Sequence, residues 1–180
     1  MALNIWRRFS TRIKRILIIA SFFILSIILT IAGTLTPLSP SEAQNIKQEL
    51  DEMRENISVQ FIFGNNFLLC LSFFIPFVGP VFGCYVLYST GVVIAADSVV
   101  AGVHPLLSLL LLFIFPFTWL EFLAYSTAFS QSVWLIWRII QRKGKDELVN
   151  TCIVISICAV MLLVAAVIEM AVLNALSPVS

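Results

Sequence analysis

Carboxylate and carboxamide side chains interrupt the apolar stretches of this 180-residue chain, among them Asn65, Asn66, Asp97, Glu121 and Glu169. An ionised carboxylate in hydrocarbon costs on the order of 3 kcal/mol or more, so such a residue needs a partner. Two carboxyl groups near one another would share a proton or be stabilised by amide donors, a role that Asn65 and Asn66 suit. Three interpretations follow: a polar cluster that locks helices together, a site for a proton, ion or ligand, or carboxylates that reach interfacial water.

Other catalytic or metal-binding patterns are weak in this sequence. His104 and the acids are ordinary ligands for a divalent metal, but they lack H-x-x-x-H or E-x-x-H spacing. The sequence contains no G-x-S-x-G, Walker or H-E-x-x-H motif. The four cysteines fall in apolar runs without C-x-x-C and are interpreted as small buried hydrophobes (Cys70, Cys84, Cys152, Cys158). We therefore expect no enzymatic activity and no cofactor.

Composition places these residues in a membrane protein. The chain is 60% hydrophobic and 12% charged, whereas soluble domains are about half apolar and about a quarter charged. The net charge of +1 gives no preference for nucleic acid. We predict a single all-α polytopic domain over residues 1–180 in the plasma membrane, with five transmembrane helices at about 16–35, 61–77, 81–102, 117–140 and 151–176.

The first of these runs has an alternative interpretation. Basic residues precede it and Ser41-Glu42-Ala43 resembles a cleavage site, as in a signal peptide. The run of 20 uncharged residues from Ile16 to Leu35 is longer than the usual signal-peptide core of about 7–15 residues. A membrane helix is the preferred prediction.

The apolar run from Pro105 to Ile140 is too long for one crossing, and Pro116 is its natural break. Either Leu106 to Phe115 forms a short re-entrant or interfacial helix before the fourth span, or two short spans share the run. Positive residues stay on the cytoplasmic side. Keeping Arg138–Lys145 on the same side as the basic N-terminal residues favours the first solution, with the N-terminus inside and the C-terminus outside.

Residues 39–58 predict an outer amphipathic helix. Ser39, Pro40 and Glu42 form a helix start with an N-cap, an N1 proline and an N3 glutamate. An apolar stripe follows at spacings of three and four (Ala43, Ile46, Leu50, Met53, Ile57). The stripe suits either a protein partner or the outer face of the chain's own bundle. Asn56 begins a glycosylation sequon by pattern.

With this orientation, the five polar residues of the apolar helices share one level in the outer leaflet. Ala124, Ala128, Gln131 and Ser132 follow Glu121 on one helical face, and Phe122, Phe129, Val133 and Ile136 take the opposite face. Small and polar residues favour helix contacts and large apolar ones favour lipid. We therefore expect Glu121 to face its neighbours and the phenylalanines to face lipid.

Three stretches resemble the stage II sporulation protein M family: FGNN at Phe63–Asn66, PFTWLEFLA at Pro116–Ala124 and AAVIEMAV at Ala165–Val172. The order and spacing agree along nearly the whole chain after the first helix. Phe117 and Thr118 stand where histidine and glycine are typical, and Thr90 stands where an asparagine usually precedes Gly91.

The resemblance implies a membrane scaffold without chemistry of its own, similar to the member that recruits cell-wall hydrolases during engulfment in endospore formers. We accordingly expect a scaffold or accessory subunit that binds other membrane or extracytoplasmic proteins, or forms a homo-oligomer. The alternatives are a small ion-coupled carrier that uses the outer carboxylates, or an accessory subunit of a membrane metalloenzyme complex.

Overall fold

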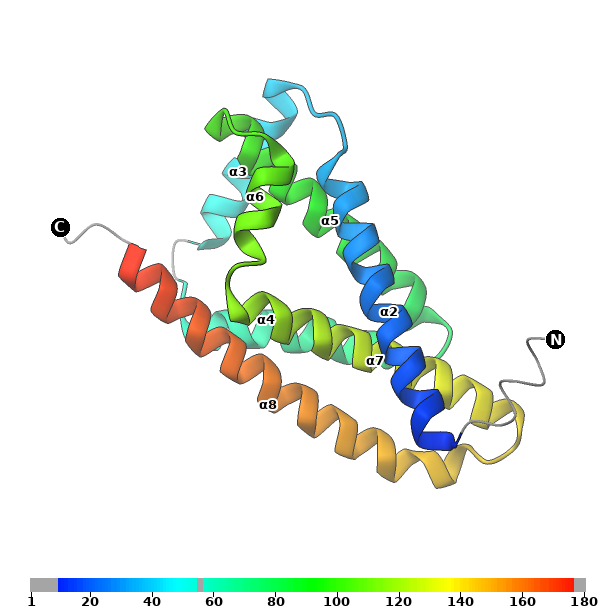
Figure 1. The fold of residues 1–180 in the computed structure, drawn as a ribbon. Coiled ribbons are helices and arrows are strands. Elements are labelled where there is room, and N and C mark those ends of the chain that lie inside the picture. Colours follow the sequence, from blue (N-terminus) through cyan, green and yellow to red (C-terminus); the bar gives the residue numbers. More distant parts are fainter. Residues whose placement is uncertain (1–9, 55–56, 177–180) are drawn as a thin grey trace.

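The computed structural model describes residues 10–54 and 57–176 and confirms an all-helical chain (Figure 1). Within these residues there are seven helices and no strand: α2 (Thr11–Thr34), α3 (Pro40–Arg54), α4 (Val59–Phe73), α5 (Val78–Ala101), α6 (Pro105–Leu112), α7 (Pro116–Ile140) and α8 (Gly144–Leu176). Asn56, the sequon residue, lies outside the described residues.

Three of the described helices are long and apolar enough to cross a membrane: α2, α5 and the Glu147–Leu176 part of α8. The bent pair of α6 and α7 makes a fourth when it is counted as one span. The predicted second span at 61–77 corresponds to α4, which ends at Phe73 and has only 15 residues. At 1.5 Å per residue α4 is about 22 Å long, which is shorter than the roughly 30 Å of hydrocarbon. The five-span count therefore stays a prediction.

The break at Pro116 separates α6 from α7. The two helices meet at 87°, and Pro116 occupies the start of α7. Thr118 Oγ1 donates to the Leu112 carbonyl over 2.9 Å, and Trp119 Nε1 donates to the Phe113 carbonyl over 2.8 Å. Carbonyls left without helical partners at the end of α6 are thereby satisfied by side chains from the first turn of α7.

Glycines bring α2 and α5 into backbone contact. A Cβ on Gly33 would lie 2.0 Å from the Tyr88 carbonyl oxygen, and a Cβ on Gly91 would lie 2.2 Å from that of Thr30. Thr30 Oγ1 also donates to the Leu87 carbonyl over 3.4 Å. Small residues at a helix crossing permit this close approach and the dispersion contacts that accompany it.

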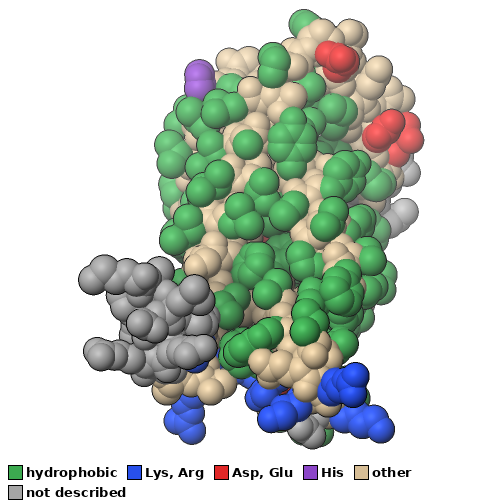
Figure 2. Space-filling model, turned by 90° about the vertical axis from the view of Figure 1, so that its right-hand side faces the viewer, with side chains coloured by type: hydrophobic (Ala, Val, Ile, Leu, Met, Phe, Trp, Pro, Cys, Tyr) green, Lys and Arg blue, Asp and Glu red, His purple; other side chains and the backbone are tan. Residues whose placement is uncertain are grey.

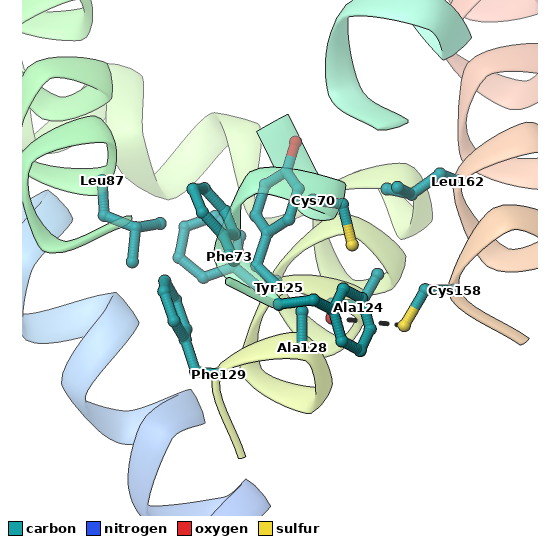
Figure 3. Packing of buried hydrophobic residues seen from close by; sticks show 11 residues of the cluster. Cys70, Phe73, Leu87, Ala124, Tyr125, Ala128, Phe129, Cys158 and Leu162 are labelled. Carbon is teal, nitrogen blue, oxygen red and sulfur yellow. Dashed lines mark hydrogen bonds between the residues drawn. The ribbon is translucent and has the colours of Figure 1, made fainter. Parts of the chain in front are cut away.

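The core surrounds α7, which contacts α2, α4, α5 and α8. Figure 3 shows side chains from α4, α5, α7 and α8 packed together, including Phe73, Leu87, Tyr125 and Leu162. The expectation that Phe122 and Phe129 face lipid is wrong, because both are buried in this cluster. The expectation that one face of α7 contacts helices and the opposite face contacts lipid does not hold, since neighbouring helices cover most of its circumference.

Charged side chains gather at the two ends of the molecule. Figure 2 shows hydrophobic side chains over the middle of one face, Lys and Arg at the lower end, and acidic and histidine side chains at the upper end. The lower end holds the start of α2 and the turn between α7 and α8, and the upper end holds α3 and α6 (Figure 1). An apolar belt between two charged ends is the pattern of a chain that crosses a bilayer.

Candidate functional site

All five predicted polar residues line one cleft. The cleft has a volume of about 550 Å³ and is lined by residues of α3 to α8. Asn65 and Asn66 come from α4, Asp97 from α5, Glu121 from α7 and Glu169 from α8. The remaining wall is mostly apolar and includes Phe61, Tyr85, Val93, Phe117 and Phe122. The cleft is thus a partly polar cavity in the apolar body of the protein.

A hydrogen bond between α4 and α7 forms the polar wall of this cleft. Asn66 Nδ2 donates to Glu121 Oε1 over 2.7 Å. Glu169 lies close enough to Glu121 for their charges to interact. Three helices that are distant in sequence therefore place amide and carboxylate groups together, which is the geometry expected of a polar cluster or a small ligand site.

The side chains of Asn65 and Asp97 differ in whether they have a hydrogen-bond partner within the chain. Asp97 Oδ1 accepts from Lys47 Nζ over 3.0 Å, which ties α5 to α3. Asn65 is exposed in the cleft and makes no hydrogen bond within the described part of the chain. Its carboxamide is therefore free to contact a group outside this chain.

The apolar stripe of α3 faces the chain's own helices in part. Ala43 has no exposed surface, and α3 packs against α5. Leu50, Met53 and Ile57 line the cleft, and Ile46 is half-buried. Ala43 is thus buried within the chain, and the use of the rest of the stripe by a partner stays a prediction. Met53 remains 57% exposed and keeps the end of the stripe accessible.

The helix start predicted for α3 is formed by a reciprocal pair of bonds. Glu42 N donates to Ser39 Oγ over 3.3 Å, and Ser39 N donates to Glu42 Oε2 over 2.8 Å. The bonds from Ser39 lower the pKa of the Glu42 carboxyl below its ordinary value. This capping box places the acidic α3 helix over the cleft.

A second polar cluster, missed by sequence reasoning, lies at the opposite end of the molecule. Glu147, only 1% exposed, is bonded by Arg15 Nη2 and Gln131 Nε2 and lies 3.4 Å from Arg138 Nε. Gln131 Nε2 also donates to Thr151 Oγ1 over 2.9 Å. The cluster joins α2, α7 and α8. No local signal marks this cluster in the sequence, because Glu147 follows a run of basic residues.

Trp134 belongs to this second cluster. Its ring lies 4.9 Å from the Arg15 guanidinium carbon and 5.9 Å from that of Arg138. The side chain is 3% exposed, so Trp134 is buried among its neighbouring helices and does not sit at a lipid interface. Two guanidinium groups against one indole ring stabilise the contact between α2 and α7.

The other residues considered for metal binding or reactivity, His104 and the cysteines, do not form a common site. His104 caps α6, where its Nδ1 accepts from the Leu106 amide over 3.3 Å. Among the described residues, no three His, Cys, Asp or Glu side chains gather closely enough to hold a metal ion. Cys70 and Cys158 are buried, Cys84 is half-buried and Cys152 is exposed. Burial as small hydrophobes therefore holds for two of the cysteines but not for Cys152.

Residues 16–172 match the profile of the family described as stage II sporulation protein M. The chain belongs to this family. Comparisons with curated proteins and with solved structures gave no match. The family match includes the three stretches that carry the resemblance, and Asn65, Asn66, Glu121 and Glu169 from those stretches all line the cleft. The departures from the family's typical residues, Phe117, Thr118 and Thr90, line it as well.

Proposed function

We propose that this member of the stage II sporulation protein M family is a non-enzymatic membrane scaffold or accessory subunit. The family resemblance supports this role, as do the polar contacts between its helices. Asn66, Lys47 and Gln131 each bond to an acidic side chain on another helix. Such bonds fix helices relative to one another, as a scaffold that presents a constant surface requires.

The observation that carries the proposal is the largely apolar layer between the two polar clusters, in which the buried Ser26 and Ser126 hydroxyls bond to carbonyls of their own helices. Glu121 and Gln131 are ten residues apart on α7, about 15 Å along the helix. Between them Ala124, Tyr125 and Ala128 are buried in the core, and Phe73 packs on Phe129 at 4.7 Å between ring centroids. A carrier needs a polar path to both faces, so this layer favours a rigid support over a transport route.

We further propose that the chain crosses the plasma membrane five times, with the N-terminus inside and the C-terminus outside. The positive-inside rule supports this orientation, because nine basic residues lie in residues 7–15 and 138–145. In this arrangement α4 crosses a thinned part of the bilayer next to α5. The cleft and α3 then lie on the outer side, where membrane or extracytoplasmic partners are available.

The test is to extract the full chain from its native membranes in mild detergent and to identify the proteins that accompany it. A scaffold is expected to copurify with specific proteins in fixed stoichiometry, at higher apparent mass than the lone chain. Recovery of the lone chain from several mild detergents would count against the proposal.

A small ion-coupled carrier is the second candidate, and the cleft is the observation in its favour. Its carboxylates face a volume of about 550 Å³, which is within the usual range of ligand sites. In proteoliposomes, a cation flux that disappears in the Glu121→Gln variant would favour the carrier over the scaffold. A scaffold is expected to leave passive flux at the level of protein-free vesicles.

A further inference from the structure

An apolar groove lies between α2 and α7 and begins near the basic end of the molecule. It has a volume of about 600 Å³, and all its lining residues are apolar or aromatic (Ile16, Ile19, Ala20, Phe23, Ile24, Trp119, Leu123). The groove is accessible, since Ile16 is 64% exposed and Ile24 is 58% exposed. Trp119 Nε1, the one side-chain nitrogen in the lining, already donates to the Phe113 carbonyl. The groove therefore suits an apolar group rather than a polar one.

One face of α2 carries both this groove and an exposed arginine. Ile16, Ala20 and Phe23 recur at spacings of four and three residues, so they lie on one face of the helix. Arg12 precedes Ile16 by four residues and shares that face. Arg12 makes no hydrogen bond or ion pair within the described part of the chain, and residues 1–9 contain no acid that could neutralise it. A cation thus stands at the end of an apolar groove.

The end of the molecule where the groove begins has an excess of positive charge. Residues 10–15 and 138–147, which lie there, contain seven Lys and Arg residues and two acids. One of the acids, Glu147, is already paired with Arg15 and Arg138. Five positive charges remain in excess when both acids are counted, and Figure 2 shows Lys and Arg side chains gathered at this end. Basic side chains beside an apolar membrane surface attract the headgroups of anionic lipids.

The length of the groove matches one leaflet of a bilayer. Arg12 and Phe23 are eleven residues apart on α2, about 16–17 Å along the helix. The hydrocarbon of one leaflet is about 15 Å thick, half of the roughly 30 Å of the bilayer. Phe23 lies near the middle of the 24-residue helix and stacks on Trp119 at 6.0 Å between ring centroids. A membrane helix of a partner would need a groove through both leaflets, whereas an acyl chain needs only this length.

From these observations we propose that the groove between α2 and α7 binds an anionic phospholipid of the leaflet at the basic end. The lipid phosphate accepts hydrogen bonds from the Arg12 guanidinium, whose planar array of donors matches a phosphate. One acyl chain lies along the groove against Ile16, Ala20 and Phe23. The proposal is separate from the scaffold function, since the groove and the cleft share no lining residue.

The test uses the full-length chain, purified in mild detergent and stripped of lipid, with dioleoylphosphatidylglycerol as the probe. Native mass spectrometry counts the lipids bound to each chain as the lipid concentration rises. Dioleoylphosphatidylcholine has the same acyl chains without net charge, and glycerol 3-phosphate has the charged headgroup without chains. One phosphatidylglycerol per chain is expected, with an affinity about tenfold higher than that of phosphatidylcholine. Glycerol 3-phosphate should not displace it.

Three variants separate a defined site from a general attraction between charges. Arg12→Gln should lower the preference for phosphatidylglycerol about fivefold, because it removes the cation at the groove. Lys143→Gln removes the same charge from an exposed position outside the groove and should change the preference by less than about twofold. Ala20→Phe fills the groove from an exposed position and should weaken the binding of both lipids without changing thermal unfolding.

Several results would overturn the proposal. Equal affinities for the two lipids would indicate ordinary contact with surrounding lipid, and equal losses in Arg12→Gln and Lys143→Gln would indicate a diffuse electrostatic effect. Displacement by glycerol 3-phosphate would indicate a site for a free anion. A lipid-free dimer that disappears in Ala20→Phe would make the groove an interface between copies. Lipid that binds only after residues 1–9 are removed would assign the groove to the chain's own N-terminal residues.

Discussion

Glu121 and Glu147 are both acids on apolar helices, yet their surroundings differ. Glu121 receives one amide bond and faces a cleft, whereas Glu147 is enclosed by two arginines and two amides. The first has capacity left for another molecule, and the second is saturated within the chain. Substitutions at these two positions should therefore act differently.

Glu121→Leu should destabilise the fold by about 1–3 kcal/mol, because Asn66 Nδ2 loses its acceptor in a low-dielectric site. Thermal unfolding in detergent measures the loss. Glu121→Gln retains an oxygen that can accept from Asn66 and should unfold close to the unmodified chain. Identical melting temperatures for the Leu and Gln variants would mean that this hydrogen bond does not stabilise the fold.

Glu147→Ala should destabilise the fold by about 3 kcal/mol, because it leaves Arg15 and Arg138 without their shared carboxylate. Both arginines retain partial contact with water, which keeps the expected value at the lower end for a broken buried pair. Thermal unfolding is again the measurement. Glu49→Ala, at an exposed acid, is the control, and an equal effect of the two substitutions would contradict the assigned role of the cluster.

The two acids also show what the sequence could reveal at this scale. Glu121, Glu169 and the paired asparagines stand out because their neighbours are apolar, so their convergence was predictable. Glu147 follows Arg142, Lys143 and Lys145 and resembles an ordinary loop acid. Its burial depends on Arg15, more than a hundred residues away, and no local pattern encodes that contact.

At the scale of elements, glycines decide how closely the helices pack. Gly33→Ala should destabilise the fold by more than 1 kcal/mol, because its Cβ would overlap the Tyr88 carbonyl on α5. Gly64→Ala is the matched control, since a Cβ there meets nothing within 4 Å. That variant should gain about 0.5–1 kcal/mol from helix propensity. The two variants should shift the melting temperature in opposite directions. A loss of stability of similar size in both would mean that the contact between α2 and α5 is not the cause.

The stability of the first turn of α3 should depend on pH, because Glu42 titrates there. Ser39 holds the pKa of Glu42 below its ordinary value of 4.5, so the folded state favours the ionised form. The stabilisation is complete above pH 4.5 and is lost as the pH falls through the lowered value. The protection factors of the amides of residues 42–45 against hydrogen exchange should decrease on that descent. Glu42→Gln should remove this pH dependence, and a persistent dependence would assign it to another group.

Helix boundaries were predictable where a chemical signal marks them, as at Pro116 and at Ser39 with Glu42. The end of α4 is marked as well, because Pro76 lies three residues beyond it and a proline disfavours helical backbone in the residue before it. The predicted span extended to Phe77 because residues 74–77 continue the apolar run. Phe77 adopts a φ of 67°, and a Cβ on Gly79 would lie 2.2 Å from the Phe73 carbonyl oxygen. The helix thus ends at Phe73, ahead of Pro76, and the chain turns tightly before α5 begins at Val78.

For the whole molecule, the separation of charge predicts which end faces which side of the membrane. Ser41→Cys should react with an impermeant maleimide added to intact cells, whereas Lys145→Cys should react only after permeabilisation. The unmodified chain, whose cysteines lie on apolar helices, provides the baseline. The reverse pattern would invert the proposed orientation and move the cleft to the inner side.

The backbone contact between Gly33 and Gly91 has a mechanical consequence. Helices that touch through side chains can slide by changing rotamers, but two backbones in contact have no such freedom. We therefore expect α2 and α5 to move as one rigid body. Any widening of the cleft would then require the other helices that line it to move relative to α5.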